Sequence, residues 1–154
     1  MKEYQWKAGA RIKADPETVG RLFDRLDETV GLNAENVLDS ARDENSPIHN
    51  EFEWNDTDAA EMYRLSQARH LINCLTVKII ERDDAAPVRA YFKISDDNYE
   101  QTKNIIKVEE KRRSLLEQAL SELRTFQRKY SILKELAEVF AEIDKANRKN
   151  EESA

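Results

Sequence analysis

The sequence is poor in the residues on which disulfide frameworks and most catalytic sites depend. Its 154 residues hold one cysteine, Cys74, together with three glycines and two separated histidines, His49 and His70. One thiol cannot close an internal disulfide, and these three side chains lack the spacing of a zinc or nucleophile site. Three scattered glycines build neither a phosphate-binding loop nor a dinucleotide fingerprint. We therefore predict a protein that is not an enzyme, with no catalytic residues, no metal and no cofactor.

Long apolar runs and an excess of basic residues are also missing. No run approaches the ~20 apolar residues of a membrane-spanning helix. The first residues, Met1 to Arg11, mix charged and aromatic side chains and do not follow the charged-then-apolar order of a secretion signal. The net charge of −6 disfavours non-specific binding to nucleic acid or to anionic membranes. The expected location is the cytosol, with no membrane association.

What the chain has in abundance is charge on a helix-forming background. Charged residues make up 36% of it and hydrophobic residues 40%, while proline and glycine number three each. This composition is typical of helices that have one wetted face and share one modest core. We predict a mainly α protein of the α+β class, with a helical module at 1–108, a long amphipathic helix at 109–148 and a disordered tail at 149–154.

The order of local signals within 1–108 predicts three helices followed by strands. Asp15 and Pro16 begin the first helix and Gly31 ends it, because aspartate caps helices, proline suits the first turn and glycine stops them. Val88 to Ile94 is a β-branched and aromatic run that suits an antiparallel hairpin with Leu75 to Ile80. The other expected elements are a strand or aromatic-packed arm at 1–12, helices at 34–42 and 56–75, and a third strand or a helix at 104–108.

Apolar residues in the last third of the chain recur in steps of three and four, which places them on one stripe of a helix. At ~1.5 Å per residue, one continuous helix over 109–148 would span roughly 60 Å, more than a compact domain of this size covers. Part of the stripe is therefore expected to face another chain in a homodimer. A single break near Tyr130 and Ser131 is the alternative to a continuous helix. The predicted oligomerisation residues are Leu116, Leu123, Phe126, Tyr130, Leu133 and Phe140.

The segment from Asp43 to Asn55 combines a proline with several aromatic and apolar side chains. Because such side chains need burial, they either close the open end of the helical core or anchor a protein partner. An acid–base or metal site at His49, Glu51 and Glu53 is a third interpretation, but it lacks a second histidine at ligand spacing. The candidate partner-binding residues are Ile48, His49, Phe52 and Trp54.

The helix that precedes the hairpin has a polar face suited to reading nucleic acid. Three helices, a hairpin and a long helix are the order of a winged-helix module, in which this face would enter a DNA groove. Against this interpretation, the first 84 residues contain eleven Lys and Arg but eighteen Asp and Glu. A solvated face whose arginines pair with nearby acids is the simpler alternative. The nucleic-acid or anion candidates are Arg64, Gln67 and Arg69 on this helix and Lys111, Arg112 and Arg113 at the start of the long helix.

Short blocks spread over most of the chain carry a resemblance to other proteins. They are Ser46-Pro47-Ile48-His49, Phe52-Glu53-Trp54-Asn55-Asp56, Ala59-Ala60, Tyr63-Arg64, Gln67-Ala68-Arg69, Phe126, Arg128-Lys129-Tyr130 and Leu133. In these blocks the chain resembles a group of small uncharacterised proteins encoded by bacteriophages, prophages and other mobile elements. The resemblance implies a bacterial host cytosol and a gene near DNA-handling functions. It implies no activity and no catalytic residues.

The sequence supports two functional hypotheses of different classes. The first is a non-enzymatic phage or mobile-element interaction protein, which binds a protein partner through its acidic helical body and oligomerises through its C-terminal helix. An acidic surface can occupy the basic groove of a DNA-handling or defence protein, so inhibition by mimicry is one possible use. The second hypothesis is a winged-helix transcriptional regulator that binds DNA through Arg64, Gln67 and Arg69.

Overall fold

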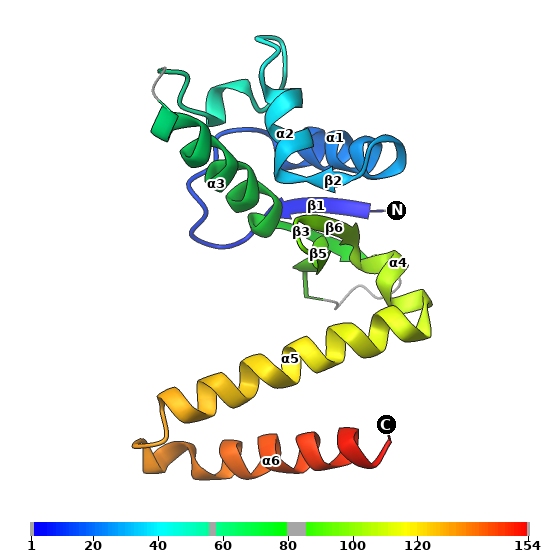
Figure 1. The fold of residues 1–154 in the computed structure, drawn as a ribbon, viewed down its shortest axis with the longest axis vertical. Coiled ribbons are helices and arrows are strands. Elements are labelled where there is room, and N and C mark those ends of the chain that lie inside the picture. Colours follow the sequence, from blue (N-terminus) through cyan, green and yellow to red (C-terminus); the bar gives the residue numbers. More distant parts are fainter. Residues whose placement is uncertain (1, 56–57, 80–85, 154) are drawn as a thin grey trace. The chain divides into compact units, whose positions relative to one another are not determined.

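The computed structural model describes residues 2–55, 58–79 and 86–153, which form two compact units. Unit 1 is Met1–Asn104 and unit 2 is Ile105–Ala154. The division falls four residues before the predicted boundary at 108, inside the short helix α4 (Thr102–Lys107). The class is mainly α with β, as the sequence predicts. Each unit is described by itself below (Figure 1).

The helices of unit 1 begin and end where the capping residues require. Helix α1 (Pro16–Thr29) starts after Asp15, whose side chain accepts a 2.8 Å hydrogen bond from the Thr18 N–H, and Gly31 follows its end with φ of 89°. Helix α2 (Ala34–Ala41) is capped in the same way by Asn33. Helix α3 spans Asp58–Cys74. The three helices predicted for this part of the chain are therefore present.

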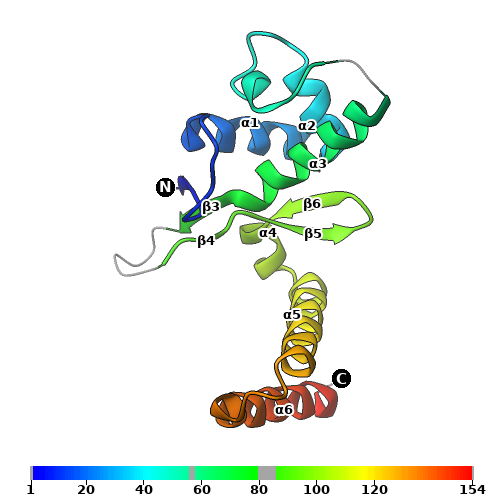
Figure 2. The same cartoon turned by 90° about the vertical axis from the view of Figure 1, so that its left-hand side faces the viewer.

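Two three-stranded antiparallel sheets lie beneath these helices (Figure 2). The first sheet has the order β1 (Lys2–Trp6), β3 (Leu75–Ile79), β4 (Val88–Arg89). Of the two alternatives predicted for residues 1–12, a strand or an aromatic-packed arm, the structure therefore shows an edge strand. The second has the order β2 (Leu32–Asn33), β6 (Asn98–Gln101), β5 (Tyr91–Ser95).

The predicted hairpin is present but its second strand is divided between the two sheets. Thr76 pairs with Arg89 and Val77 with Val88, and after Ala90 the chain passes into β5 of the second sheet. The partner of β5 is β6, a polar strand without a sequence signal strong enough for us to predict it. Residues 104–107 belong to helix α4, so the helical alternative holds there. Ile80, the last residue of the predicted first strand, lies outside the described residues.

The core of unit 1 forms between α1, α2, α3 and the strands. Its fully buried side chains include Phe23 and Tyr91, whose rings meet edge to face with centroids 6.0 Å apart. Strand β1 approaches α1 so closely that a Cβ added at Gly20 would overlap the ring of Tyr4. A glycine is therefore required at this position of α1 in spite of its low helix propensity.

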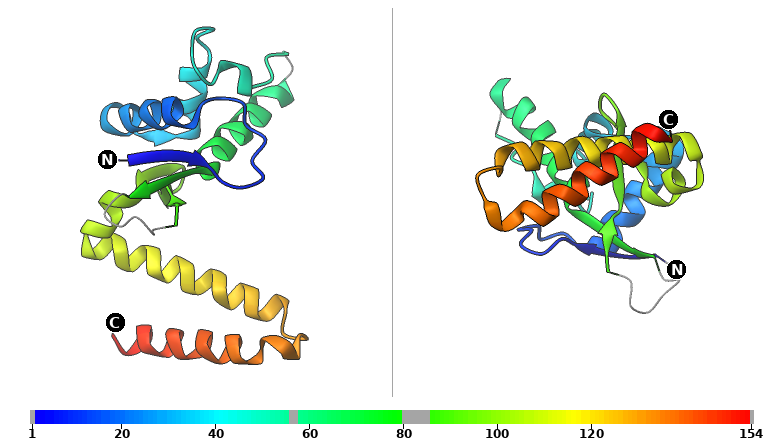
Figure 3. Two further views of the ribbon diagram at one scale, coloured as in Figure 1. Left: turned by 180° about the vertical axis from the view of Figure 1, so that it is seen from behind. Right: turned by 90° about the horizontal axis from the view of Figure 1, so that it is seen from below.

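Unit 2 is a helical hairpin rather than one continuous helix. Helix α5 (Glu109–Lys129) ends at Tyr130, a single 3-10 turn spans Lys134–Leu136, and α6 (Ala137–Glu152) runs back beside α5 (Figures 1 and 3). The break lies at the predicted position, so the 60 Å continuous helix is not formed. Because α6 continues to Glu152, the predicted disordered tail is corrected for residues 149–152.

Candidate functional site

Apolar side chains of the predicted partner-binding loop pack against the core of unit 1. The side chains of Ile48 and Phe52 are 0% and 7% exposed and belong to the core cluster of unit 1, against which Trp54 also packs. The Trp54 indole N–H donates to the His49 carbonyl at 2.9 Å, and the two rings stack with centroids 4.9 Å apart. The Nδ1 of His49 donates to the Ala41 carbonyl at 2.8 Å. These residues close the helical core, so the prediction of Ile48 and Phe52 as partner anchors is corrected. His49 and Trp54 are half-buried, and their role as partner contacts stays a prediction.

The acids of this loop accept hydrogen bonds from backbone N–H groups. The Oε1 of Glu51 accepts the N–H groups of Lys13 and Ala14, at 2.9 and 2.7 Å. The Oε1 of Glu53 accepts the N–H of Asn55 at 3.2 Å. Within the described part of the chain, no group of three His, Cys, Asp or Glu side chains is placed to hold a metal ion. The acid–base interpretation of His49 therefore gains no support from the geometry.

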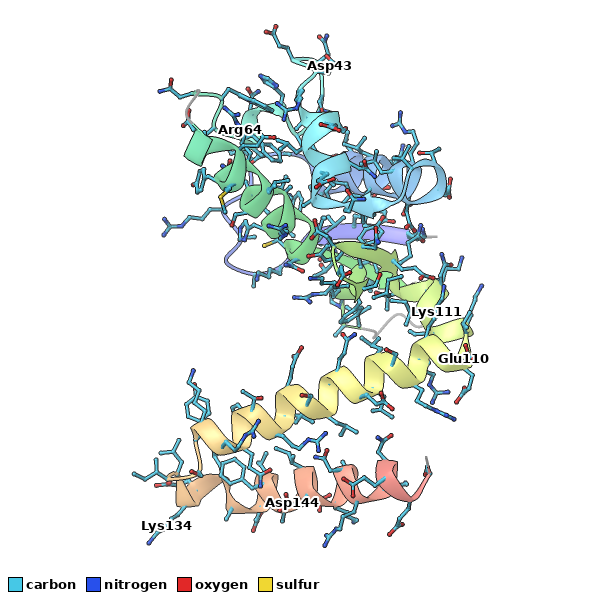
Figure 4. The ribbon with its side chains drawn as sticks, viewed as in Figure 1. Asp43, Arg64, Glu110, Lys111, Lys134 and Asp144 are labelled. Atoms are coloured by element: carbon cyan, nitrogen blue, oxygen red, sulfur yellow. The ribbon has the colours of Figure 1, made fainter. Side chains whose placement is uncertain are left out.

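The arginine predicted to be the first DNA-reading residue is buried. Arg64 is 4% exposed, its Nε donates to the Glu53 carbonyl at 2.6 Å, and one terminal nitrogen lies 3.2 Å from the Glu61 carboxylate (Figure 4). Its guanidinium also stacks 5.1 Å from the centre of the Trp54 ring, a cation–π contact. Arg64 thus fastens the 53–55 segment to α3, and its prediction as a nucleic-acid contact is corrected.

The other two residues of the predicted reader face also have partners within the protein. The amide of Gln67 donates to the Glu51 carbonyl and accepts the Glu53 N–H, each at 3.2 Å. Arg69 binds both carboxylate oxygens of Asp97, at 3.1 and 3.4 Å, and this hydrogen bonding raises the pKa of the guanidinium above its ordinary value. The three side chains therefore lie on one helix, α3, and each forms hydrogen bonds with other residues of unit 1.

The basic cluster at the start of α5 is exposed. Lys111, which Figure 4 labels, lies in the first turns of α5 together with Arg112 and Arg113. Arg112 is 3.8 Å from the Glu109 carboxylate. Two acids, Glu109 and Glu110, precede the cluster, which leaves this end of the helix with a small positive excess. Its binding of an external anion stays a prediction.

Sequence reasoning missed a polar network inside unit 1. The Oδ1 of Asp24 accepts hydrogen bonds from the Tyr4 and Tyr91 hydroxyls, each at 2.7 Å, and Lys2 lies 3.1 Å from its other oxygen. Burial raises the pKa of both tyrosines well above the ordinary value, and the adjacent Asp24 carboxylate adds to the rise. Because these residues come from three elements that are far apart in the sequence, no local pattern marks them. The network links β1, α1 and β5, and its buried groups are hydrogen-bonded to one another.

Among the surface pockets lined by described residues of unit 1 are two of about 330 Å³ each. One is bordered by Arg11, Tyr63 and His70, and its Glu51 and Gln67 are held by the backbone bonds described above. The other is bordered by Asp27 and Glu100, together with amide side chains of the β6 region. The first pocket is also lined by Ser66, which lies one helical turn before His70 on α3.

The exposed apolar surface of unit 2 is the strongest candidate for a functional site. Among the described residues of α5 and α6, only Leu120 and Ile143 are buried. Four of the six predicted oligomerisation residues are 39–48% exposed, namely Leu116, Leu123, Phe126 and Leu133. The other two, Tyr130 and Phe140, are half-buried against Phe126, with ring centroids 4.9 and 6.3 Å from it. Val139 on α6 is 48% exposed as well and was not predicted.

We define the apolar stripe as Leu116, Leu123, Phe126, Tyr130, Leu133, Val139 and Phe140. No helix in the described residues has the length and apolar character needed to span a membrane. The chain matches no protein-family model, no curated protein and no solved structure.

Proposed function

We propose that the protein is a non-enzymatic interaction protein that associates through its C-terminal hairpin and binds a protein partner through its acidic body. The observation that carries the proposal is the apolar stripe of unit 2. Two helices of 21 and 16 residues that bury only two apolar side chains gain little hydrophobic stabilisation. A stripe with this much half-exposed apolar surface is typical of a protein-binding face.

The charge of the protein is concentrated in unit 1. Residues 1–104 contain fourteen Lys and Arg against twenty-one Asp and Glu, a net charge of −7, whereas residues 105–154 contain eleven against ten. The exposed acids of α2 and the following loop contribute to this field, and Asp43 lies at the outer tip of that loop (Figure 4). Such a field attracts basic protein surfaces and speeds their association.

The partner class that this charge suits is a protein with a basic groove, such as a DNA-handling or defence protein of a bacterial host. The proposed setting is the cytosol of a bacterium that carries a phage or other mobile element, on the basis of the sequence resemblance. The acidic body, rather than the buried side chains of Ile48 and Phe52, is the proposed contact surface. Occupation of a groove that normally holds nucleic acid would inhibit that partner.

The DNA-binding alternative lacks a supporting observation. Arg64, Gln67 and Arg69 are bonded to carbonyls and carboxylates of unit 1, so these bonds would have to be exchanged for contacts with DNA. We expect no mobility shift of duplex DNA at ~50 mM salt, where phosphate contacts are strongest. A specific shift that disappears in Arg69→Ala would restore the alternative.

The proposed partner surface is tested by affinity capture from bacterial lysate. The wild type is compared with Glu35→Gln/Asp43→Asn/Glu44→Gln, which removes three exposed charges from α2 and its loop. Glu138→Gln/Glu151→Gln/Glu152→Gln is the matched control, because it removes three exposed charges from α6. We expect a specific protein that is captured by the wild type and the control, lost with the first variant and released by high salt. Capture of the same proteins by all three would contradict the proposal.

A further inference from the structure

The apolar stripe is part of a repeat that is wider than a two-helix hairpin can cover. A coiled-coil pair needs two apolar positions per seven residues, whereas a helix in a bundle core shows three. On α5 and its C-cap residue, the three lines of the repeat are Leu116, Leu123 and Tyr130; Ala119 and Phe126; Leu120 and the polar Gln127. On α6 and its N-cap residue, they are Leu136, Ile143 and the polar Asn150; Val139 and Ala146; Phe140 and the polar Asn147. Both helices therefore have the broad face of bundle helices.

The hairpin covers only one side of this broad face. Leu120 on α5 and Ile143 on α6 are buried, and Gln127 and Asn147 are half-buried. The side at Phe126 and Val139 stays 39% and 48% exposed. A second layer of helices is needed to cover that side.

The charges of the hairpin favour a second copy of the same hairpin as that layer. Unit 2 is nearly neutral, so its net charge selects neither an acidic nor a basic partner. Its two helices differ, however, near the turn that joins them. In that half, α5 carries Arg124, Arg128 and Lys129 against one acid, while residues 137–144 of α6 carry three acids and no Lys or Arg. A two-fold axis that sets α5 of one copy against α6 of the other brings these opposite charges together.

The distribution of large side chains selects the orientation of the two copies. Phe126, Tyr130 and Phe140 lie in the turn half of the hairpin, whereas Asn147 and Asn150 occupy repeat positions at its open end. With both turns at the same end, aromatic rings pack on aromatic rings. In the opposite orientation they would pack on the two asparagines, and the basic half of α5 would meet the three cations at 145–149.

We infer that two copies of the chain form a four-helix bundle from their α5–α6 hairpins, with both turns at the same end and α5 of each copy against α6 of the other. This inference rests on the proposed self-association and adds the partner and its orientation. All neighbouring helices in such a bundle are antiparallel, as in up-down-up-down bundles.

The interface is tested first by the mass of the protein in solution. By light scattering, the wild type is expected at twice the chain mass of 18.0 kDa, and Val139→Glu at the mass of one chain at the same concentration. Val30→Glu is the matched control, because Val30 is also exposed, at 63%, but lies in unit 1. It should keep the dimer mass, and circular dichroism should show unchanged helix content for both variants. A dimer that survives Val139→Glu would place the interface elsewhere and overturn the inference.

The orientation is tested by the distance between spin labels on Lys134→Cys, an exposed position in the turn that Figure 4 labels. The native Cys74 is fully buried, and labelled wild type serves as the background control. With both turns at the same end, the two labels lie closer than the length of α6, which is about 24 Å for its 16 residues. A dimer with a longer distance would overturn the orientation but leave the proposed self-association intact. A monomeric wild type at every concentration would overturn both.

Discussion

The two units of this protein are built from similar helices but differ in what the helices bury. In unit 1, α1, α2 and α3 enclose a core that contains fully buried Phe23 and Tyr91 and is crossed by a hydrogen-bonded network around Asp24. In unit 2, α5 is the longest helix of the described chain, yet it buries Leu120 alone. Helix length and apolar periodicity therefore do not by themselves make a core. In unit 1 the apolar faces of the helices meet each other, whereas in unit 2 much of the apolar surface stays exposed.

The largest effect should come from a cavity in the core of unit 1. Phe23→Ala removes a fully buried ring in edge contact with Tyr91, and we expect a loss of about 3–5 kcal/mol in the free energy of unfolding. Urea denaturation followed by near-ultraviolet circular dichroism measures it. Phe92→Ala is the control. Phe92 is partly exposed and follows Tyr91 in β5, so its truncation should reduce the free energy of unfolding by less. Equal losses would show that the core is not centred where the structure places it.

The next effect distinguishes a buried arginine from an exposed one. Arg64→Ala removes the bond to the Glu53 carbonyl and the contact with Trp54, so we expect a loss of about 1.5–3 kcal/mol in the free energy of unfolding. Arg21→Ala removes an arginine that is 74% exposed in its pair with Glu17, and its effect should stay within about 0.5 kcal/mol. Thermal unfolding of both variants gives the comparison. A small effect of Arg64→Ala would reopen a functional role for this side chain.

A smaller effect is expected for a substitution in unit 2, and unlike that of Phe23→Ala in unit 1 it should depend on protein concentration. Leu123→Ala truncates a side chain that is 40% exposed in the single chain and covered in the proposed bundle. We expect a melting temperature close to that of the wild type in dilute samples and a difference that grows as the protein concentration rises, because association stabilises the folded state by mass action. Phe23→Ala should show a loss that does not vary with concentration. Differential scanning calorimetry over a hundredfold concentration range tests both.

The smallest effect depends on pH. Burial raises the pKa of the Asp27 carboxyl above its ordinary value, and the nearby Glu100 and Asp24 carboxylates add to the rise. A group with a raised pKa in the folded state contributes its stabilisation below the unfolded pKa and loses it as pH rises through the folded pKa. Asp27→Asn, which stays neutral, should therefore be more stable than the wild type at pH 7, by only about a few tenths of a kcal/mol because the side chain is half-exposed.

The advantage of Asp27→Asn should vanish below about pH 4, where the wild-type carboxyl is protonated. Urea midpoints at the two pH values measure the difference. Glu28→Gln, the exposed neighbour, serves as the control for general removal of negative charge. A gain for Asp27→Asn that is the same at both pH values would show that charge burial is not its cause.

Local signals in the sequence predict the elements well where one residue type controls the backbone. Asp15 and Pro16 mark the start of α1, Gly31 its end, and Tyr130 the break between α5 and α6. The same signals fail at β6, whose polar residues carry no strand pattern and which forms because β5 and β2 pair with it. The division of residues 88–94 between two sheets could not be predicted either, because it depends on pairing with strands that are distant in the chain.

The sequence by itself determined the helical class, the acidic body and the apolar repeat of the last third, because composition and periodicity are properties of the chain alone. Only the tertiary structure decided which side chains are available to a partner. It buries Ile48, Phe52 and Arg64 and leaves Leu116, Phe126 and Val139 at the surface. Burial depends on contacts between segments far apart in sequence, and the same aromatic or arginine can complete a core or meet a partner according to what lies across from it.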